Sequence, residues 1–456
     1  MRITPFSALL GGLLVTSCPA TEPDSRLDPD IEFMVRHISP ARLKTDVYTL
    51  AGFHTRHTLS ETESDTRGIG AARRWIKAEF KKISADTGGR LQVAFDRFQQ
   101  PPTPPRLPAG AEIVNVVATL PGSQPESVNR IYVVSGHYDS RSLGIMDTAT
   151  YAPGANDDGS GTVAVLELAR AMAGHTFDAT IVFMAVASEE QGLNGARHWA
   201  DTAKAADRHI AGMFTNDIIG NTLDEDGKRD ASHVRLFASG VPTDNPMSAE
   251  VLAQIRTGGE NDFPTRQLAR HIKEVGERYV DDFEVRIVYR LDRYLRGGDH
   301  APFVAAGYPA VRFTEPKEYF AHQHQDVRVE DGIQFGDLPE FVDADYVAQV
   351  ARVNAAALAT LARAPAAPTG VQIEAVALTN DSTLRWDRGP EPDLAGYRIV
   401  WRETTSAFWE HHAWAGDVTR FTIADVSKDN VIFGVQAVDV DGHASPAVYP
   451  TPWRGR

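Results

Sequence analysis

The chain of 456 residues is poor in cysteine and short of basic residues. Cys18 is its only cysteine, so no disulfide can form within one chain. Lysine and arginine total 46 against 61 aspartates and glutamates, which gives a formal net charge of -15. An acidic surface repels phosphate groups, which excludes nucleic acid and anionic membrane surfaces as partners.

Long apolar runs are also lacking beyond the N-terminus, so we expect no transmembrane segment. The run 6–15 follows Arg2 and has the length of a secretory signal core. Val15-Thr16-Ser17-Cys18 then resembles a bacterial lipobox, with Cys18 as the lipidated residue. We expect a signal peptide at 1–17, export to a bacterial envelope, and membrane attachment only through Cys18. The alternative is a plain secretory signal in which Cys18 has no role.

The length fits two domains. Residues 18–30 are rich in proline, aspartate and glutamate and are typical of a tether. The stretch 364–370 is rich in alanine and proline and is typical of a linker. We therefore predict a main domain at 31–363 and a second domain at 371–456.

The main domain contains apolar runs with helical patterns between several of them. Such runs indicate strands that are buried on both faces in a mostly parallel α/β sheet flanked by helices. The predicted strands are Ile113–Leu120, Ile131–Ser135, Thr180–Ala187, Ile210–Thr215, Val234–Ala238, Val285–Tyr289 and Ala310–Phe313. In such sheets, functional groups gather at the carboxyl ends of the strands.

The second domain has a different pattern. Short β-like runs, among them 372–378, 383–386, 397–402 and 431–440, are separated by turn residues. This pattern predicts an all-β sandwich.

Three motifs follow strand-like runs. They are Gly136-His137-Tyr138-Asp139-Ser140, Gly154-Ala155-Asn156-Asp157-Asp158-Gly159-Ser160-Gly161 and Ser188-Glu189-Glu190-Gln191-Gly192. Together they place one histidine, the adjacent aspartates Asp157 and Asp158, and the adjacent glutamates Glu189 and Glu190 at the end of a sheet. This is a ligand set for divalent metal ions, with one carboxylate left over as a base.

The paired acidic residues also have structural interpretations that involve no metal ion. Asp157 or Asp158 could cap the following helix, but both cannot be the cap, and we expect Asp157 as ligand and Asp158 as support. Glu189 and Glu190 could lie in a solvated loop. Adjacent like charges are unfavourable unless a cation relieves them, and adjacent side chains diverge. One glutamate can therefore bind metal while the other faces the substrate.

Three further residue groups complete the pattern. Asp139 can accept a hydrogen bond from the second imidazole nitrogen of His137 and so orient it. Asp217 follows the strand-like run 210–215, although an aspartate there is more often a turn residue. The run 321–326 contains two histidines and an aspartate, and it could also be a surface loop.

The order His, Asp, Glu-Glu, Asp, His over residues 35–363 resembles the di-zinc aminopeptidases related to bacterial leucyl aminopeptidases. Glutamate carboxypeptidase-like enzymes and glutaminyl cyclases belong to the same clan. The segment Gly298-Asp299-His300-Ala301-Pro302-Phe303 resembles that family too. The second domain resembles a fibronectin type III module through Leu384-Arg385-Trp386 and Ala395-Gly396-Tyr397-Arg398-Ile399-Val400-Trp401, with Trp386 in its core.

The resemblance implies two Zn²⁺ ions, with Asp157 between them and Glu189 as general base. The late histidine lies four residues before an aspartate in the family, which selects His322, with His324 as second choice. The implied metal ligands are His137, Asp157, Glu190, Asp217 and His322; the implied supporting residues are Asp139, Asp158, Asp299, His300 and Asp326.

The resulting hypothesis is an exported di-zinc aminopeptidase that acts on peptides with a free N-terminus. One alternative has the same fold but carboxypeptidase or glutaminyl cyclase activity. The other is a non-catalytic surface lipoprotein that binds a partner through the β-domain.

Overall fold

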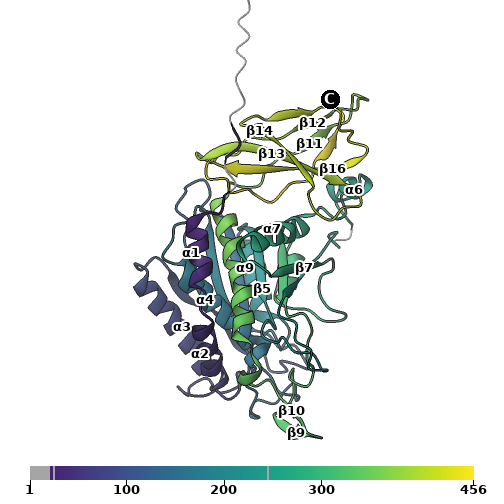
Figure 1. The fold of residues 1–456 in the computed structure, drawn as a ribbon. Coiled ribbons are helices and arrows are strands. Elements are labelled where there is room, and N and C mark those ends of the chain that lie inside the picture. Colours follow the sequence, from purple (N-terminus) through teal and green to yellow (C-terminus); the bar gives the residue numbers. More distant parts are fainter. Residues whose placement is uncertain (1–20, 24–25, 244–245, 456) are drawn as a thin grey trace, which may run out of the picture.

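The computed structural model describes residues 21–23, 26–243 and 246–455, and it comprises a large α/β domain and a smaller β-domain (Figure 1). The predicted signal peptide and Cys18 lie outside the described residues. None of the helices in the described part of the chain is long and apolar enough to cross a membrane.

The α/β domain is built on an eight-stranded sheet. In pairing order its strands are β1 (Gln92–Gln100), β2 (Ala111–Leu120), β4 (Thr180–Val186), β3 (Arg130–His137), β5 (His209–Asn216), β8 (Ala310–Thr314), β6 (His233–Ala238) and β7 (Glu284–Val288). Strands β4, β3, β5 and β8 are mutually parallel, and β1, β2 and β6 each add an antiparallel pairing. The seven predicted strands are all present. Strand β1 was not predicted, because this edge strand is half exposed along its length and has no continuous apolar run.

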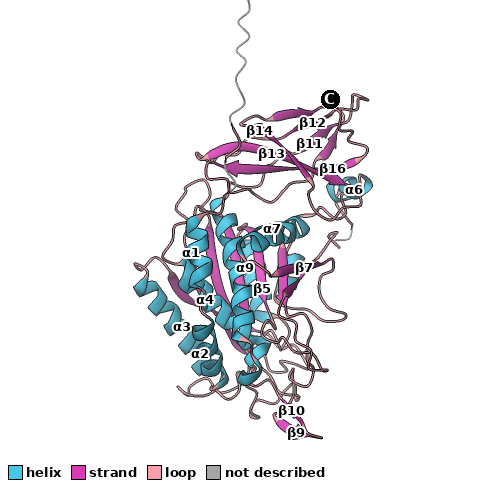
Figure 2. Ribbon diagram, viewed as in Figure 1, coloured by secondary structure: helices cyan, strands magenta, loops and turns pink. Residues whose placement is uncertain are grey.

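Helices cover both faces of the sheet (Figure 2). One face carries α3 (Gly68–Asp86), α4 (Gly161–Met172), α7 (Pro264–Tyr279) and α9 (Ala344–Arg363), with α1 (Pro29–His37) and α2 (Pro40–Ala51) packed outside α4 and α9. The other face carries α5 (Asn194–Ala205) and α8 (His300–Ala305). The short strands β9 (Arg328–Glu330) and β10 (Ile333–Phe335) form a hairpin, followed by the turn η2 (Pro339–Phe341).

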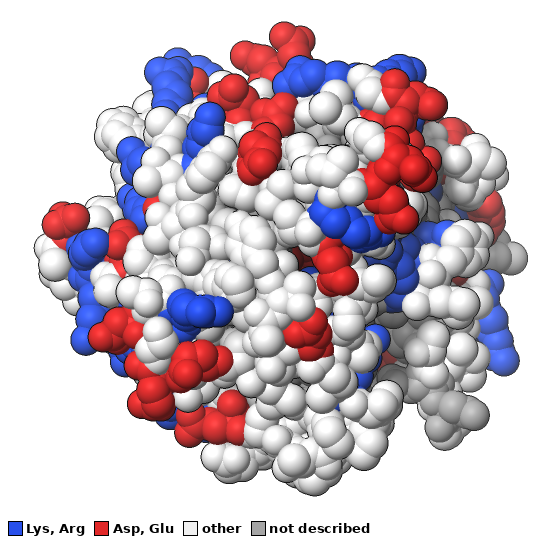
Figure 3. Space-filling view, turned by 90° about the horizontal axis from the view of Figure 1, so that it is seen from below, with Lys and Arg blue, Asp and Glu red and all other residues white. Residues whose placement is uncertain are grey.

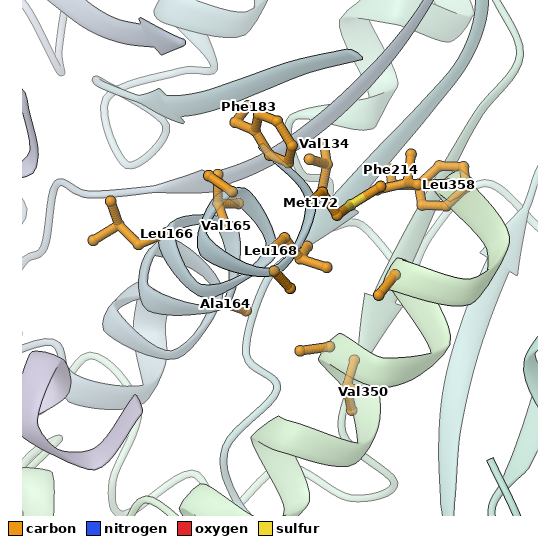
Figure 4. Close-up of a cluster of buried hydrophobic side chains, with 14 of the residues drawn as sticks. Val134, Ala164, Val165, Leu166, Leu168, Met172, Phe183, Phe214, Val350 and Leu358 are labelled. Atoms are coloured by element: carbon orange, nitrogen blue, oxygen red, sulfur yellow. The ribbon is translucent and has the colours of Figure 1, made fainter. Parts of the chain in front are cut away.

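The core of the larger face is packed between the sheet and helices α4 and α9 (Figure 4). Phe183 and Phe214 of the sheet lie beside Met172 of α4 and Leu358 of α9, and all four are fully buried. Burial of each such side chain stabilises the fold by about 1.5–3 kcal/mol. This packing holds α4 against the sheet, so the turn at its N-terminus is placed firmly next to the strand ends.

The β-domain contains two sheets, which confirms the predicted fold class. One sheet has the order β15 (Arg420–Ile423), β12 (Ser382–Arg385), β11 (Gln372–Glu374), β17 (Thr451–Trp453), and the other has β14 (His411–Gly416), β13 (Leu394–Glu403), β16 (Val431–Asp439). Trp386 lies in its core beside Tyr397, with 5.2 Å between ring centroids. This domain therefore has a hydrophobic core of its own.

Buried ion pairs nonetheless join the β-domain to the α/β domain. Asp262, which follows α6 (Ala249–Arg256), accepts hydrogen bonds from Arg270 of α7 at 3.0 Å and from Arg402 of β13 at 2.7 Å. Arg130 pairs with Glu391 at 3.4 Å, and both side chains are at most 4% exposed. A sequence linker was expected to separate two independent cores. The pairs Asp262–Arg402 and Arg130–Glu391 instead connect the two domains through buried side chains.

Asp262→Asn should therefore destabilise the protein. The substitution leaves Arg270 and Arg402, each 3% exposed in its side chain, without a carboxylate. Loss of one partner of a buried pair costs about 3–5 kcal/mol. The matched control is Asp417→Asn, which removes an exposed pair with Arg388 and should cost less than about 1 kcal/mol. Urea unfolding followed by tryptophan fluorescence measures both, and equal small effects would contradict the role of Asp262.

Candidate metal centre

The acidic and histidine motifs meet at the carboxyl ends of β3, β4 and β5, the lower end of the molecule in Figure 1. His137 is the last residue of β3, Asp217 follows β5, and Glu189 and Glu190 follow β4. Asp157 lies in η1 (Ala155–Ser160), the turn before α4. Figure 3 views this end directly and shows acidic and basic side chains side by side around a largely uncharged centre.

Two glycines allow the strand end and the helix start to approach this closely. A Cβ atom on Gly136 would lie 2.4 Å from the carbonyl carbon of Gly161, and one on Gly161 would lie 2.1 Å from the carbonyl oxygen of Asn216. Any side chain at either position would push α4 away from the sheet. The glycines therefore set how far Asp157 reaches toward His137.

His137, Asp157 and Asp217 form the first half of the centre. Their nearest ligand atoms all lie within 4.8 Å of one another, and all three residues are buried. Nε2 of His137 lies 3.2 Å from Oδ1 of Asp157 and 4.0 Å from Oδ1 of Asp217. Nδ1 of His137 lies 3.1 Å from the carbonyl oxygen of Asp139. Because a carbonyl can only accept, Nδ1 carries a proton and the neutral imidazole offers Nε2 as the ligand atom.

Asp157, Glu190 and His324 form the second half, again within 4.8 Å. Nε2 of His324 lies 2.8 Å from Oδ2 of Asp157 and 2.8 Å from Oε1 of Glu190. Asp157 thus turns one carboxylate oxygen to each half. A shared carboxylate between two groups of nitrogen and oxygen donors suits two divalent ions.

Negative charge dominates the electrostatics of the site. Burial lowers the pKa of His324, but Glu190 and Asp157 outweigh it and raise that pKa to about 10. Burial raises the pKa of Glu189 well above its usual range, and the nearby carboxylates of Asp217 and Glu190 raise it further. The buried carboxylates at the centre thus favour additional positive charge. A divalent cation would supply that charge and return these carboxylates to the ionised state.

His322 does not join the site, in contrast to the expectation. Its ring stacks on Phe341 with 3.8 Å between centroids and an interplanar angle of 3°, and burial lowers its pKa to about 4. The backbone at His324 is left-handed, with φ of 54°, and this turn directs the side chain of His324 toward Asp157. Gln323, between the two histidines, also donates to Asp157 at 3.2 Å. The spacing to Asp326 contains no information about this turn, which places His324 rather than His322 beside Asp157 and Glu190.

Asp139 and Asp158 support the loops, and the carboxylate of Asp139 lies 3.6 Å from Nδ1 of His137, the nitrogen that the sequence paired it with. The carboxylate of Asp139 accepts from the backbone N–H groups of Glu189 at 3.2 Å and Glu190 at 3.1 Å, while its carbonyl orients His137. Asp158 accepts from the N–H of His137 at 2.9 Å and of Gly161 at 3.0 Å. Each carboxylate therefore ties two elements of the site together.

The remaining predicted supporting residues are Asp299, His300 and Asp326, and they differ in their contacts. Asp299 is fully buried, and neither of its carboxyl oxygens has a hydrogen-bond partner among the described residues. Burial, with Asp217 and Asp139 nearby, raises its pKa to about 7. His300 contacts the carbonyl oxygen of Leu291 at 2.9 Å. Asp326 accepts from the N–H of Leu143 at 3.1 Å, so it joins two loops and orients neither histidine.

The structure also reveals supporting residues that sequence reasoning missed. Asp337 accepts from the N–H groups of Asn156 at 2.8 Å and Asp157 at 2.7 Å. Arg312 is fully buried and pairs with Asp217 at 2.9 Å, and Arg141 pairs with Glu190 at 3.1 Å. No motif flags these residues, because each is isolated in the sequence. Only Arg312 could have been noticed in the sequence, because it is a charged residue within the apolar strand β8.

A cavity of about 580 Å³ opens beside the centre. Asp157, Glu189, Glu190, Asp217 and His324 line one part of it. A small substrate can therefore reach both the candidate ligands and Glu189. The arrangement is that of a metallohydrolase: clustered metal donors, one carboxylate outside the ligand clusters, and space for a substrate.

Comparison with known proteins defines the class further. Residues 115–330 match the family described as Peptidase family M28. A probable zinc metalloprotease of Leptosphaeria maculans is 47% identical over 426 residues, which cover 93% of this chain and 97% of that protein. A probable zinc metalloprotease of Pyricularia oryzae is 47% identical over 430 residues, which cover 93% and 85%. The chain belongs to peptidase family M28 and is a zinc metalloprotease of that family. Both organisms are fungi, so these relatives do not support the bacterial lipoprotein predicted from Cys18.

Solved structures share the fold. An aminopeptidase from Aneurinibacillus sp. strain AM-1 is similar with a TM-score of 0.50 and 15% identity, over 73% of this chain and 96% of that chain. A glutaminyl cyclase of Macrostomum lignano is similar with a TM-score of 0.51 and 16% identity, over 75% and 97%. The fold is therefore common to peptidases and cyclases and does not by itself separate the two activities.

His324→Ala should lower zinc affinity, whereas His322→Ala should not. The first substitution removes a donor atom 2.8 Å from Asp157 and Glu190, and the second removes a ring stacked on Phe341. Mutation of a residue that only hydrogen-bonds to a metal ligand lowers metal affinity by about 10–100-fold. Because His324 is itself a candidate ligand, we expect His324→Ala to lower zinc affinity by more than this. Competition titration with a chromophoric zinc chelator measures both variants. A loss of affinity confined to His322→Ala would return the ligand role to that residue.

Proposed function

We propose that the protein is an aminopeptidase that uses two zinc ions to hydrolyse the N-terminal bond of peptides with a free amino group. The observation that carries the proposal is the shared carboxylate of Asp157, which faces His137 and Asp217 on one side and Glu190 and His324 on the other. This donor set of carboxylates and imidazoles fits zinc.

In this proposal His137, Asp157 and Asp217 hold one ion, and Asp157, Glu190 and His324 hold the other. Two bound zinc ions would lower the pKa of a water molecule and polarise the scissile carbonyl. Arg312 and Arg141 keep Asp217 and Glu190 in place through ion pairs of 2.9 and 3.1 Å. Asp139 and Asp158 hold the backbones of Glu190 and His137.

Glu189 is the general base. It lines the cavity and belongs to neither ligand cluster. Its carboxylate takes a proton from the attacking water and passes it to the nitrogen of the leaving amine. The hydrogen bond from its N–H to Asp139, at 3.2 Å, fixes the start of this loop.

Glutaminyl cyclase activity is the alternative within the same fold. A cyclase needs a single metal ion and no attacking water, and a complete set of five donors around two adjacent positions favours the hydrolase. A carboxypeptidase would use the same donors and differ in which end of the peptide it binds. Export, lipidation at Cys18 and the fibronectin type III character of the β-domain remain predictions from the sequence.

The test is an assay of the purified, zinc-loaded protein on aminoacyl amides. Substrates with a free amine should be hydrolysed, and their N-acetylated counterparts should not. A chelator should abolish the activity and added zinc should restore it. Release of C-terminal residues from N-blocked peptides would replace aminopeptidase by carboxypeptidase activity, and cyclisation of N-terminal glutamine without hydrolysis would establish the cyclase.

Glu189→Gln should lower kcat by about 10²–10⁴-fold while the zinc content stays at the wild-type level. The amide keeps the shape of the side chain but cannot accept a proton from water. Zinc content is measured on the same samples by elemental analysis. The matched control is Glu112→Gln, an exposed glutamate of β2 paired with Arg97, which should retain wild-type kcat. Near-normal turnover of Glu189→Gln would assign the base to another residue.

A further inference from the structure

The cavity beside the candidate metal centre has an unusual set of charged residues. Its acidic residues in the described chain are the four at the centre itself, Asp157, Glu189, Glu190 and Asp217. The remaining charged lining consists of arginines alone: Arg106, Arg141, Arg293 and Arg296. Cations bound at the centre would neutralise the carboxylates, and the arginines would then determine the charge of the cavity.

Arg296 lacks a carboxylate of its own. Its guanidinium lies 3.2 Å from Glu318, but the same carboxylate also pairs with Arg293 at 2.8 Å and Arg235 at 3.3 Å. Arg293 has a second partner in Asp292, at 3.0 Å. Three guanidinium groups thus share Glu318, and the side chain of Arg296 remains 32% exposed at the cavity. Its charge is compensated only in part.

Arg106 is the second cation available to a ligand. It donates to the carbonyl oxygen of Glu190 and forms no ion pair with any carboxylate in the described part of the chain. It comes from the proline-rich segment before β2, whereas Arg296 comes from the loop before α8. Two segments far apart in the sequence therefore bring positive charge that is at most partly compensated to one cavity. Arg141 differs, because it pairs with Glu190 and belongs to the support of the centre.

We propose that this cavity selects substrates with a carboxylate close to the scissile bond, which Arg106 and Arg296 bind. Guanidinium groups are the donors best suited to carboxylates, because they offer parallel N–H groups. The carboxylate has two possible sources: an acidic side chain, or the free C-terminus of a dipeptide. The inference rests on the proposed peptidase function and specifies its substrate class.

Two substrate pairs distinguish the sources. Glutamyl and glutaminyl 4-methylcoumaryl-7-amides differ only in a side-chain carboxylate, and Leu-Leu and Leu-Leu-amide differ only in the terminal one. We expect kcat/KM to be about 10- to 100-fold higher for the charged member of at least one pair, the effect of one or two hydrogen bonds to a charged group. Arg106→Gln and Arg296→Gln should each reduce that ratio by about tenfold.

Arg290→Gln is the matched control, because Arg290 lies on the same loop as Arg296 but stacks on the ring of Tyr294 at 3.8 Å and does not line the cavity. It should leave the ratio unchanged. Calorimetric binding of the same pairs to zinc-loaded Glu189→Gln tests the preference without turnover. Equal binding and equal kcat/KM within both pairs, or ratios insensitive to Arg106→Gln and Arg296→Gln, would overturn this inference alone. Failure to hydrolyse any substrate with a free amine would overturn the proposed function, and the binding measurement would still decide this inference.

Discussion

The crowding of carboxylates at one buried edge of the sheet is the constraint on which the site depends. Asp157, Asp158, Glu189, Glu190 and Asp217 converge where β3, β4 and β5 end. Like charges in a poorly hydrated region are costly, and each must be offset by a cation, a proton or a hydrogen bond. The raised pKa of Glu189 and that of His324 are two expressions of this cost. Bound zinc, which the relatives of this chain imply, would also offset the repulsion between these carboxylates.

The same constraint explains the carboxylates that bind no candidate ion. Asp158 accepts N–H groups from His137 and Gly161, and Asp337 accepts those of Asn156 and Asp157. Each of them accepts hydrogen bonds from two backbone N–H groups and so stabilises the backbone of the loops around the site. The rigid packing of α4 and α9 on the sheet then holds the loops in register. The packed helices and the hydrogen bonds of Asp158 and Asp337 together determine the positions of the donor atoms.

The cavity beside the centre differs from the rest of the chain in its charge. Acidic residues outnumber basic residues in the chain as a whole, yet four arginines line the cavity beside the centre. The net charge predicts that nucleic acid is not a partner, but it contains no information about local charge. A chain with a formal charge of -15 can thus present a basic pocket to a small substrate. The docking of the β-domain is equally invisible in composition, since it depends on single buried pairs such as Asp262 with Arg402.

The sequence by itself determined the seven apolar strands of the main domain and the β-rich second domain. It also determined the positions of His137, Glu189, Glu190 and Asp217 at strand ends and of Asp157 in the glycine-rich turn before a helix. These features are local, because an apolar run is buried wherever it folds and the residue after a parallel strand lies at the carboxyl edge of the sheet. Tertiary structure alone decided the rest. The choice of His324 over His322 depends on one left-handed residue, and the supporting roles of Arg312 and Asp337 depend on contacts across 95 and 180 residues of chain. Such contacts arise only when distant segments pack together, so no pattern within one segment encodes them.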